Sequence, residues 1–393
     1  MFCIREINMK RGRGQFLSKS ILAGLALAHL TVWGINNAQA QPVCRSAELF
    51  AGNPSYDEPK DRAREGQGLR EDPPLAWRTL LFAGDKLVTA VGQEIWFTDL
   101  KATPPTIKRL SGKEDLTGQA LRPGPAAQAR FANVSGLDVL PDGRLVGADQ
   151  TGNGIFLVSD PFGPACAVSF IAGTTQALES VSPGNPPNVG DIDGPGAQAR
   201  FKLPEWPAVV GDDIYFIDEG ARKIKKVAPD AAHTVTTITQ LPDGVYSAMI
   251  ALKGKLYTIG NNTKSEGFII EIDPATGAQR EIVKGRADAF EGDGAINVSG
   301  LTTDGQGLFT TQSGQLLYVT LNGKVTSVAG SGDYFDFRQP YDPTKPQTPA
   351  KVQLVTMRRL QTAGSNVFLA YKDKAVYFCA ANTTPYIERL LFQ

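Results

Sequence analysis

The sequence predicts an all-β protein, a six-bladed β-propeller whose blades are four-stranded antiparallel sheets. Three observations lead to this prediction. The chain has 41 glycines and 26 prolines among its 393 residues, more turn-forming residues than globular proteins usually contain. An eight-residue segment occurs twice. Short apolar runs joined by tight turns fill the rest of the chain, and no long helical pattern interrupts them.

The repeated segment marks two of the blades. Gly124–Phe131 and Gly194–Phe201 are identical at seven of eight positions. After each copy, apolar runs alternate with small turns, which is the pattern of a four-stranded antiparallel sheet. The strands expected after the first copy are 136–140, 144–148, 155–158 and 167–172, and those after the second are 207–210, 214–217, 223–227 and 235–239.

Weaker copies of the same pattern account for four more blades. We expect strands at 78–83, 86–91, 94–100 and 106–110 in the first blade, and at 246–252, 255–259, 268–272 and 279–283 in the fourth. The fifth blade is expected at 298–303, 307–311, 315–320 and 324–329, and the sixth at 357–362, 366–370, 375–380 and 386–391. Residues 41–393 are therefore predicted to form one propeller domain.

One blade also resembles a known family. The segment Ile171–Val227 is similar to an NHL repeat in its Ile-Ala-Gly turn, its Asp-Gly-x-Gly segment, its Ala-x-Phe-x-x-Pro motif and its Tyr-Phe-Ile-Asp strand. The segment Leu110–Ser159 matches less fully, with Val134 where the motif has Pro204, and the other blades depart strongly from it. The resemblance implies a six-bladed propeller, but not one activity, because propellers host many functions.

The first 40 residues have the pattern of a secretory signal peptide. A basic start is followed by an apolar run at 21–35 and by Ala-Gln-Ala at 38–40. An N-terminal membrane anchor and a lipid attached at Cys44 are the alternatives. Removal of residues 1–40 leaves 35 basic and 39 acidic residues, a net charge of −4. We expect a secreted or periplasmic domain, 41–393, with no membrane insertion of the mature chain.

The way in which the ring closes is left open by the sequence. The segment 46–51 reads like another outermost strand, and propellers remove free sheet edges by pairing an N-terminal strand with the last blade. However, the sixth blade already has a predicted fourth strand at 386–391. A disulfide between Cys44 and Cys379 would staple the ring in an oxidising compartment; otherwise Cys44, Cys166 and Cys379 are unpaired or paired differently.

Composition excludes several kinds of chemistry. Only His233 remains in the mature chain, which excludes a histidine-rich zinc site, and its place in a predicted loop favours an exposed, non-catalytic side chain. The segments 191–194 and 292–294 look like fragments of calcium loops, but they lack the remaining spaced carboxylates, so turns are the preferred interpretation. There is no basic stripe for nucleic acid.

One face of the propeller carries the candidate site. The loops that lead into the innermost strands and the loops between second and third strands open on the same side. Aligning the blades on their second strands places ten candidate ligand-binding residues there: Trp77, Gln93, Asp149, Glu205, Trp206, Asp218, Tyr246, Asn261, Gln312 and Arg358. Tyr371 is expected in the corresponding second loop of the sixth blade.

These residues combine aromatic platforms, amides, carboxylates and one guanidinium, a set suited to a polar organic ligand such as a sugar. Two structural interpretations stay open. Asp149 and Asp218 can accept hydrogen bonds from turn N–H groups, and Trp77 and Trp206 can pack between blades.

Two functions remain. The first is a secreted or periplasmic module that binds a protein, a carbohydrate or a small polar ligand on this face, without a cofactor. The alternative is a calcium-dependent hydrolase that resembles propeller lactonases, with Glu205, Asn261, Asp149 and Asp218 as oxygen ligands in the central channel.

Overall fold

The computed structural model divides the chain into two compact units, Met1–Gln41 and Pro42–Gln393. It describes residues 41–52, 79–103, 105–113, 119–182, 184–264, 266–284, 298–312, 315–330, 367–380 and 386–393. The predicted signal peptide lies outside the described residues. Within the described part of the chain, no helix has the length and apolar character needed to cross a membrane.

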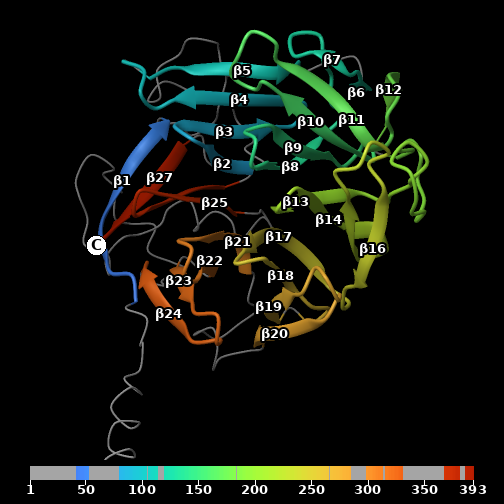
Figure 1. The fold of residues 1–393 in the computed structure, drawn as a ribbon. Coiled ribbons are helices and arrows are strands. Elements are labelled where there is room, and N and C mark those ends of the chain that lie inside the picture. The colour runs from blue at the N-terminus through green and yellow to red at the C-terminus, as the bar shows by residue number, and fades with distance from the viewer. Residues whose placement is uncertain are drawn as a thin grey trace, which may run out of the picture. The chain divides into compact units, whose positions relative to one another are not determined.

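Six antiparallel sheets form the blades of the described part of the second unit, and a seventh sheet has two strands only (Figure 1). The first sheet contains β2 (Thr79–Ala83), β3 (Lys86–Val91), β4 (Glu94–Asp99) and β5 (Ile107–Gly112). The second contains β8 (Val134–Val139), β9 (Leu145–Asp149), β10 (Gly154–Ser159) and β11 (Ala167–Gly173). The third contains β13 (Pro204–Val210), β14 (Asp213–Asp218), β15 (Lys223–Val227) and β16 (Val235–Gln240).

The remaining sheets follow the same order. The fourth contains β17 (Val245–Leu252), β18 (Lys255–Asn261), β19 (Gly267–Ile272) and β20 (Gln279–Lys284). The fifth contains β21 (Val298–Thr303), β22 (Leu308–Gln312), β23 (Gln315–Val319) and β24 (Val325–Ala329). The sixth contains β25 (Val367–Lys372), β26 (Ala375–Ala380), β27 (Tyr386–Phe392) and β1 (Cys44–Gly52).

The innermost strands close a ring. Strand β2 contacts β8, and the contacts continue in order through β13, β17, β21 and β25 back to β2. The protein is therefore an all-β, six-bladed propeller with four-stranded antiparallel blades, as the sequence predicts. Each innermost strand is paired along one edge only, so its other edge faces the axis of the ring.

The sixth blade corrects one prediction. The segment 357–362 was expected to be its innermost strand, but β25 takes that position beside β2 and β21, and 357–362 lies outside the described residues. Strand β1 is the outermost strand and pairs antiparallel with β27, with Cys44 opposite Phe392. The N-terminal strand is thus the fourth strand of this blade, and it covers an edge that β27 would otherwise expose.

Of the two alternatives for the cysteines, the structure does not support a Cys44–Cys379 disulfide. The three cysteines in the described part of the chain form no disulfide with one another. Cys44 packs in a core cluster with Leu390 and Val376, whereas Cys379 packs in a different cluster with Ile387. The two cysteines are separated by strand β27 and belong to separate layers between blades, which prevents bonding.

Each copy of the repeated segment, Gly124–Phe131 and Gly194–Phe201, runs along one blade from its outermost strand toward the axis, and each copy is called a strap below. In the first copy, Gly124 and Pro125 form a short strand, β7, that pairs with β11. In the second copy, Gly194 pairs with Val235 of β16. Strand β6 (Gln119–Leu121), which precedes the first strap, pairs with β12 (Leu178–Val181), which precedes the second.

Each strap ends in an aromatic residue of the core. Phe131 and Phe201 are both fully buried, in clusters made by their own blade and the preceding one. The ring of Phe131 lies 4.6 Å from that of Phe156, and Phe201 lies 4.8 Å from Phe216. The apolar layers between neighbouring blades thus hold the ring together.

Candidate functional site

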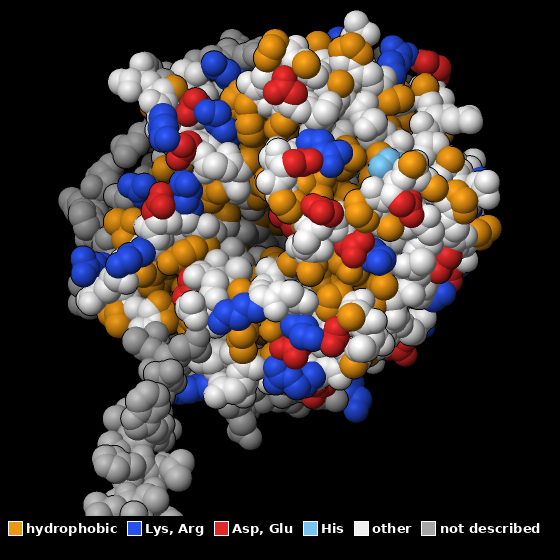
Figure 2. Space-filling view, viewed as in Figure 1, with side chains coloured by type: hydrophobic (Ala, Val, Ile, Leu, Met, Phe, Trp, Pro, Cys, Tyr) orange, Lys and Arg blue, Asp and Glu red, His pale blue; other side chains and the backbone are white. Residues whose placement is uncertain are grey.

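A cavity of about 490 Å³ lies at the axis of the ring. All six innermost strands line it. Pro141 and Gly211 belong to turns between first and second strands, and they extend the wall toward the face on which these turns lie. Figure 2 shows the molecule hollowed at the centre of the ring. A cavity of this size is in the range that holds small organic ligands.

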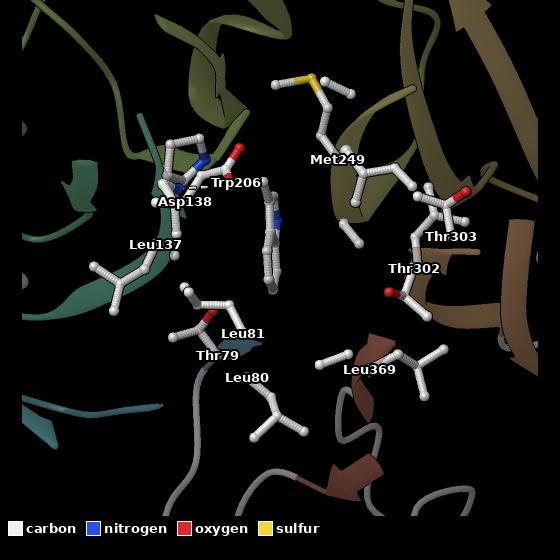
Figure 3. Close-up of a pocket in the computed structure, with 18 of the residues that line it drawn as sticks. Thr79, Leu80, Leu81, Leu137, Asp138, Trp206, Met249, Thr302, Thr303 and Leu369 are labelled. Atoms are coloured by element: carbon white, nitrogen blue, oxygen red, sulfur yellow. Dashed lines mark hydrogen bonds between the residues drawn. The ribbon is translucent and has the colours of Figure 1, made fainter. Parts of the chain in front are cut away.

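Most side chains that line the cavity are apolar, but its surface is as polar as it is apolar (Figure 3). Thr79, Thr302 and Asp138 contribute polar side chains, and the unpaired edges of the innermost strands add backbone donors and acceptors. The hydroxyl of Thr303 is engaged with Gly305 and Gly307 of its own turn. Figure 3 shows an open space with Trp206 on one side and Met249 and Thr302 on the other. Such walls combine apolar contact with a small number of orienting polar groups, as ligand sites do.

Trp206 reaches across the axis. Strand β13 pairs irregularly with β14 between Glu205 and Ala208, and Trp206 in this bulge has a positive φ of 50°. Its ring lies 5.9 Å from that of Phe368 on β25, in the blade directly opposite. The bulge therefore turns a side chain that a regular strand would hold between blades into the channel.

The indole Nε1 of Trp206 is buried and has no acceptor among the described residues. A buried donor of this kind is costly and can be satisfied by an acceptor on a ligand. Trp206 is the predicted ligand-binding residue that does line the cavity.

Asp138 is the charged residue among the described residues that line the cavity. Its Oδ2 accepts a hydrogen bond from the backbone N–H of Val209 on β13 (2.9 Å), and its Oδ1 accepts one from its neighbour Val139 (2.7 Å). Burial raises the pKa of Asp138 to about 6, against the lowering effect of these two donors. The carboxyl is consequently an anion at and above neutral pH.

Seven other predicted residues that the structure describes are not among the residues that line the cavity. Gln93 lies in the turn between β3 and β4, and the last residues of four second strands are Asp149, Asp218, Asn261 and Gln312. Glu205 and Tyr246 lie at the start of β13 and β17. These residues occupy equivalent places in five blades, as the alignment predicted.

Three other predicted positions have different outcomes. Trp77 and Arg358 lie outside the described residues. Tyr371 was expected in a loop between second and third strands, but it lies in innermost strand β25 and lines the cavity. The error follows from the strand assignment in the sixth blade, which the structure shifts by one strand.

The contacts of Asp149 and Asp218 are structural, because both carboxylates bind backbone N–H groups. The carboxylate of Asp149 is fully buried and accepts hydrogen bonds from the N–H groups of Ala132 (2.7 Å), Asn133 (2.9 Å) and Gly152 (2.8 Å). Asp218 accepts one from Lys202 (2.6 Å) in the second strap. Burial raises the pKa of each carboxyl to about 6. Each aspartate thus anchors the inner end of a strap, the alternative that the sequence left open.

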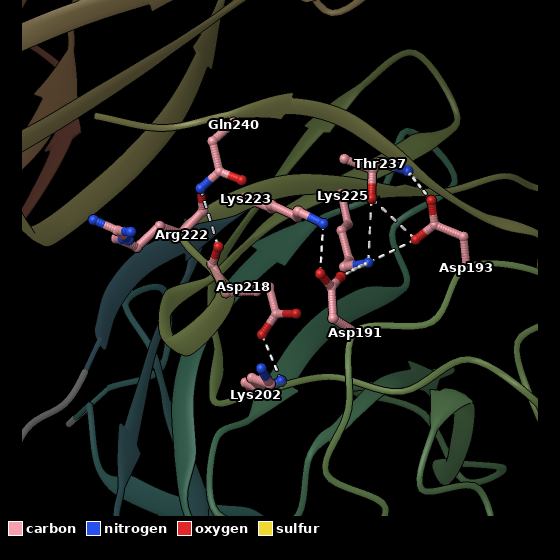
Figure 4. A network of polar contacts seen from close by, with 10 residues as sticks. Asp191, Asp193, Lys202, Asp218, Arg222, Lys223, Lys225, Thr237 and Gln240 are labelled. Carbon is pink, nitrogen blue, oxygen red and sulfur yellow. Dashed lines mark hydrogen bonds and ion pairs between the residues drawn. The ribbon is translucent and has the colours of Figure 1, made fainter. Parts of the chain in front are cut away.

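The aspartates of the predicted calcium-loop fragment are held by lysines (Figure 4). The buried Nζ of Lys225 lies 2.6 Å from Oδ1 of Asp193 and 2.9 Å from Oδ1 of Asp191, and Lys223 binds the other oxygen of Asp191 at 2.5 Å. Hydrogen bonding to Lys223 is the main cause that lowers the pKa of Asp191. The segment is a turn fixed to β15 and β16, because Thr237 also donates its N–H to Asp193 (2.6 Å).

Three of the oxygen ligands expected for calcium are engaged by donors within the chain. Asp149 accepts hydrogen bonds from three N–H groups, Asp218 accepts one from the N–H of Lys202, and Glu205 accepts one from Gln150. Across the described residues, no group of three or more histidine, cysteine, aspartate or glutamate residues is placed to hold a metal ion. The arrangement of these donors does not fit calcium.

Sequence reasoning missed two features of the cavity. Asp138 interrupts the apolar strand Val134–Val139, and an acidic residue inside an innermost strand is a signal that can be read from the sequence. The position of the Trp206 ring has no such signal, because it depends on a bulge that only the three-dimensional pairing reveals.

Known proteins share the fold of this chain. An auxiliary nutrient binding protein from Bacteroides ovatus is 13% identical, with a TM-score of 0.56 over 90% of this chain and 78% of that one. A protein of unknown function from Bacteroides thetaiotaomicron is 10% identical, with a TM-score of 0.57 over 89% and 76%. A gluconolactonase from Xanthomonas campestris has a TM-score of 0.47 at 12% identity, over 90% of this chain and 98% of that one.

The likeness to the two Bacteroides structures concerns the fold alone. No family model and no curated protein matches the sequence. The fold and the cavity therefore define the class of this protein, a six-bladed β-propeller with a ligand-sized channel at its axis.

Proposed function

We propose that this chain is a binding module that holds a small organic ligand in the central channel of the propeller. The observation that supports this proposal is the cavity of about 490 Å³ to which all six blades contribute. Residues from six separate sheets meet there, so a ligand is surrounded by a rigid wall that needs little ordering on binding. The auxiliary nutrient binding protein from Bacteroides ovatus, which has a similar fold, is in keeping with this role.

The finer features of the proposal come from the sequence. The N-terminal pattern supports export, so the module is proposed to act as a secreted or periplasmic protein. The face formed by Gln93, Glu205 and Tyr246 is a second proposed contact surface, suited to a protein partner or a carbohydrate.

The lactonase alternative has no supporting arrangement among the described residues. Its proposed ligands are engaged with backbone and side-chain donors, as described above. Turnover of a lactone panel by the purified protein in the presence of calcium, lost in a Glu205→Ala variant, would replace the binding proposal by a hydrolase.

A screen with a channel-blocking variant tests the proposal. A metabolite library is measured against the mature protein by thermal shift and native mass spectrometry, and each hit is measured again with Thr302→Tyr. Thr302 is buried and faces the open space of the cavity, so a tyrosine there fills the volume in which a ligand would lie. We expect hits whose affinity falls at least tenfold in this variant.

Thr302→Ser is the matched control, since it keeps the hydroxyl and the open volume, and it should bind as the unmodified protein does. Circular dichroism and the melting temperature of each variant show that the ring is intact. Hits that bind Thr302→Tyr with unchanged affinity would place the site elsewhere and refute the channel proposal.

A further inference from the structure

We infer that the ligand of the channel is an organic cation, a quaternary or protonated amine held between the carboxylate of Asp138 and the ring of Trp206. This inference rests on the proposed function and names the class of ligand for the same cavity. It is carried by the juxtaposition of one carboxylate and several aromatic rings in a wall without a basic side chain.

The charge of the wall favours a cation. Asp138 contributes a carboxylate, and none of the described residues that line the cavity is a lysine or an arginine. The hydrogen bonds to Asp138 in the described structure come from backbone N–H groups, which leave the net negative charge in place. Asp138 is only half-buried, but its carboxylate has no cationic partner among the residues that line the cavity, and a ligand that brings the opposite charge lowers the cost of its partial burial.

Aromatic residues contribute to the same wall. Phe82, Trp206, Phe368 and Tyr371 are among the residues that line the cavity, and Trp206 extends toward Phe368 from the opposite blade. The ring of Phe82 also packs on Tyr377, and that of Tyr371 stacks on Phe309, so Trp206 is the ring that enters the space. The faces of such rings attract cations, most strongly for tryptophan. Phe82 already shows this contact, since Nζ of Lys372 lies 5.7 Å over its ring.

Asp138 and Trp206 come from neighbouring blades and are held on adjacent strands. Strand β8 contacts β13, and the hydrogen bond from Val209 to Asp138 joins the carboxylate to the strand that carries Trp206. Figure 3 shows Asp138 and Trp206 as neighbours on one side of the open space. A single small ligand can therefore contact the carboxylate and the ring together.

The test compares two probes that differ in charge alone. Choline and 3,3-dimethylbutan-1-ol have nearly the same shape and the same hydroxyl group, but the quaternary nitrogen of choline is replaced by carbon in the alcohol. Binding to the mature protein is measured at pH 8 and physiological salt by saturation-transfer NMR. We expect choline to bind at least tenfold more tightly than the alcohol.

Three variants locate the effect. Asp138→Asn keeps an acceptor for Val209 and should abolish the preference for choline, whereas Asp142→Asn, the same change at an exposed turn, should leave it unchanged. Trp206→Leu should weaken choline binding, and Trp206→Phe should retain most of it. If Asp138→Asn fails to fold, Thr302→Tyr replaces it, and the expected result is loss of choline binding.

The outcomes separate the two proposals. Equal binding of both probes, lost for both in Thr302→Tyr, would overturn the inference of a cation but keep a binding channel. Binding of choline that survives in Asp138→Asn and in Thr302→Tyr would overturn the inference, because the cation would then bind outside the channel. Absence of binding by both probes would also overturn it, and the library screen would still decide on the channel.

Discussion

Gly136 shows how closely neighbouring innermost strands approach beside the site. A Cβ atom added to this glycine would lie 2.6 Å from Cδ of Pro207 and 3.2 Å from the backbone of Trp206. The missing side chain lets β8 pack against the bulge that carries Trp206 into the channel. A single residue in one blade thereby positions an aromatic ring that belongs to the next.

Replacing Gly136 by alanine tests this close approach. The added methyl group cannot be accommodated without a shift of Pro207, so we expect Gly136→Ala to lower the free energy of unfolding by about 1–3 kcal/mol. It should also change the emission of Trp206, because the bulge must move. Guanidinium unfolding and tryptophan fluorescence measure both effects, with Trp206→Phe identifying the emission that belongs to this residue.

Gly184→Ala is the control for this change. A Cβ at Gly184 would have only the hydroxyl of Ser182 near it, at 3.8 Å, so its effect on stability and on emission should be negligible. Equal stability of Gly136→Ala and Gly184→Ala, with unchanged emission, would show that the close approach of β8 and β13 is not required.

At the scale of elements, the two straps explain what the repeated sequence does. Each strap pairs with the outermost strand of its blade and buries its phenylalanine. The residue directly after each phenylalanine donates its N–H to the aspartate at the end of the second strand. The second strap is preceded by Asp191 and Asp193, which the buried Lys225 holds against β15. The repeated segment therefore stabilises the packing between blades, and it does not line the central cavity.

Removing the charge of Lys225 should weaken the contacts that hold the segment before the second strap against β15. Lys225→Met leaves Asp193 without its lysine and Asp191 with Lys223 alone, so we expect a loss of about 2 kcal/mol in the free energy of unfolding. Lys226→Met is the neighbouring control. Lys226 is partly exposed and lies 3.5 Å from Asp213, so its loss should cost less than about 1 kcal/mol.

Urea unfolding at neutral pH compares the two variants. Amide hydrogen exchange of Thr237, whose N–H donates to Asp193, gives a local measure of the same network. Similar stability of Lys225→Met and Lys226→Met would show that the buried lysine does not hold the strap in place.

At the scale of the whole molecule, ring closure connects the two ends of the described propeller. Strand β1 completes the outer edge of the sixth blade, and at its inner edge β25 contacts β2 of the first blade. The closed ring is what brings Asp138, Trp206 and Thr302 from three blades to one cavity. The channel is thus a property of the complete ring and of no single blade.

The sequence predicted the fold well because strands and turns are local features. Apolar alternation and small turns located the described strands to within a few residues in the first five blades, and the strap motif identified two blades directly. The sixth blade was shifted by one strand because its outermost strand comes from the other end of the chain. Local patterns carry no information on such a long-range pairing.

The candidate site was less predictable. Repeat alignment placed residues at equivalent ends of the second strands, but equivalent positions in different blades need not meet at one point. Two of them, Asp149 and Asp218, have turn-anchoring contacts that the sequence offered as an alternative. Trp206 enters the channel through an irregular strand pairing, which depends on the neighbouring blade.

The central claim is that ligand binds at the axis of the ring. The most direct measurement is a crystal structure of the mature protein with the tightest-binding compound from the library screen. The account predicts density for that compound between Trp206 and Thr302, in contact with residues from several innermost strands. Density on the face of Glu205 and Tyr246, with none in the channel, would contradict it.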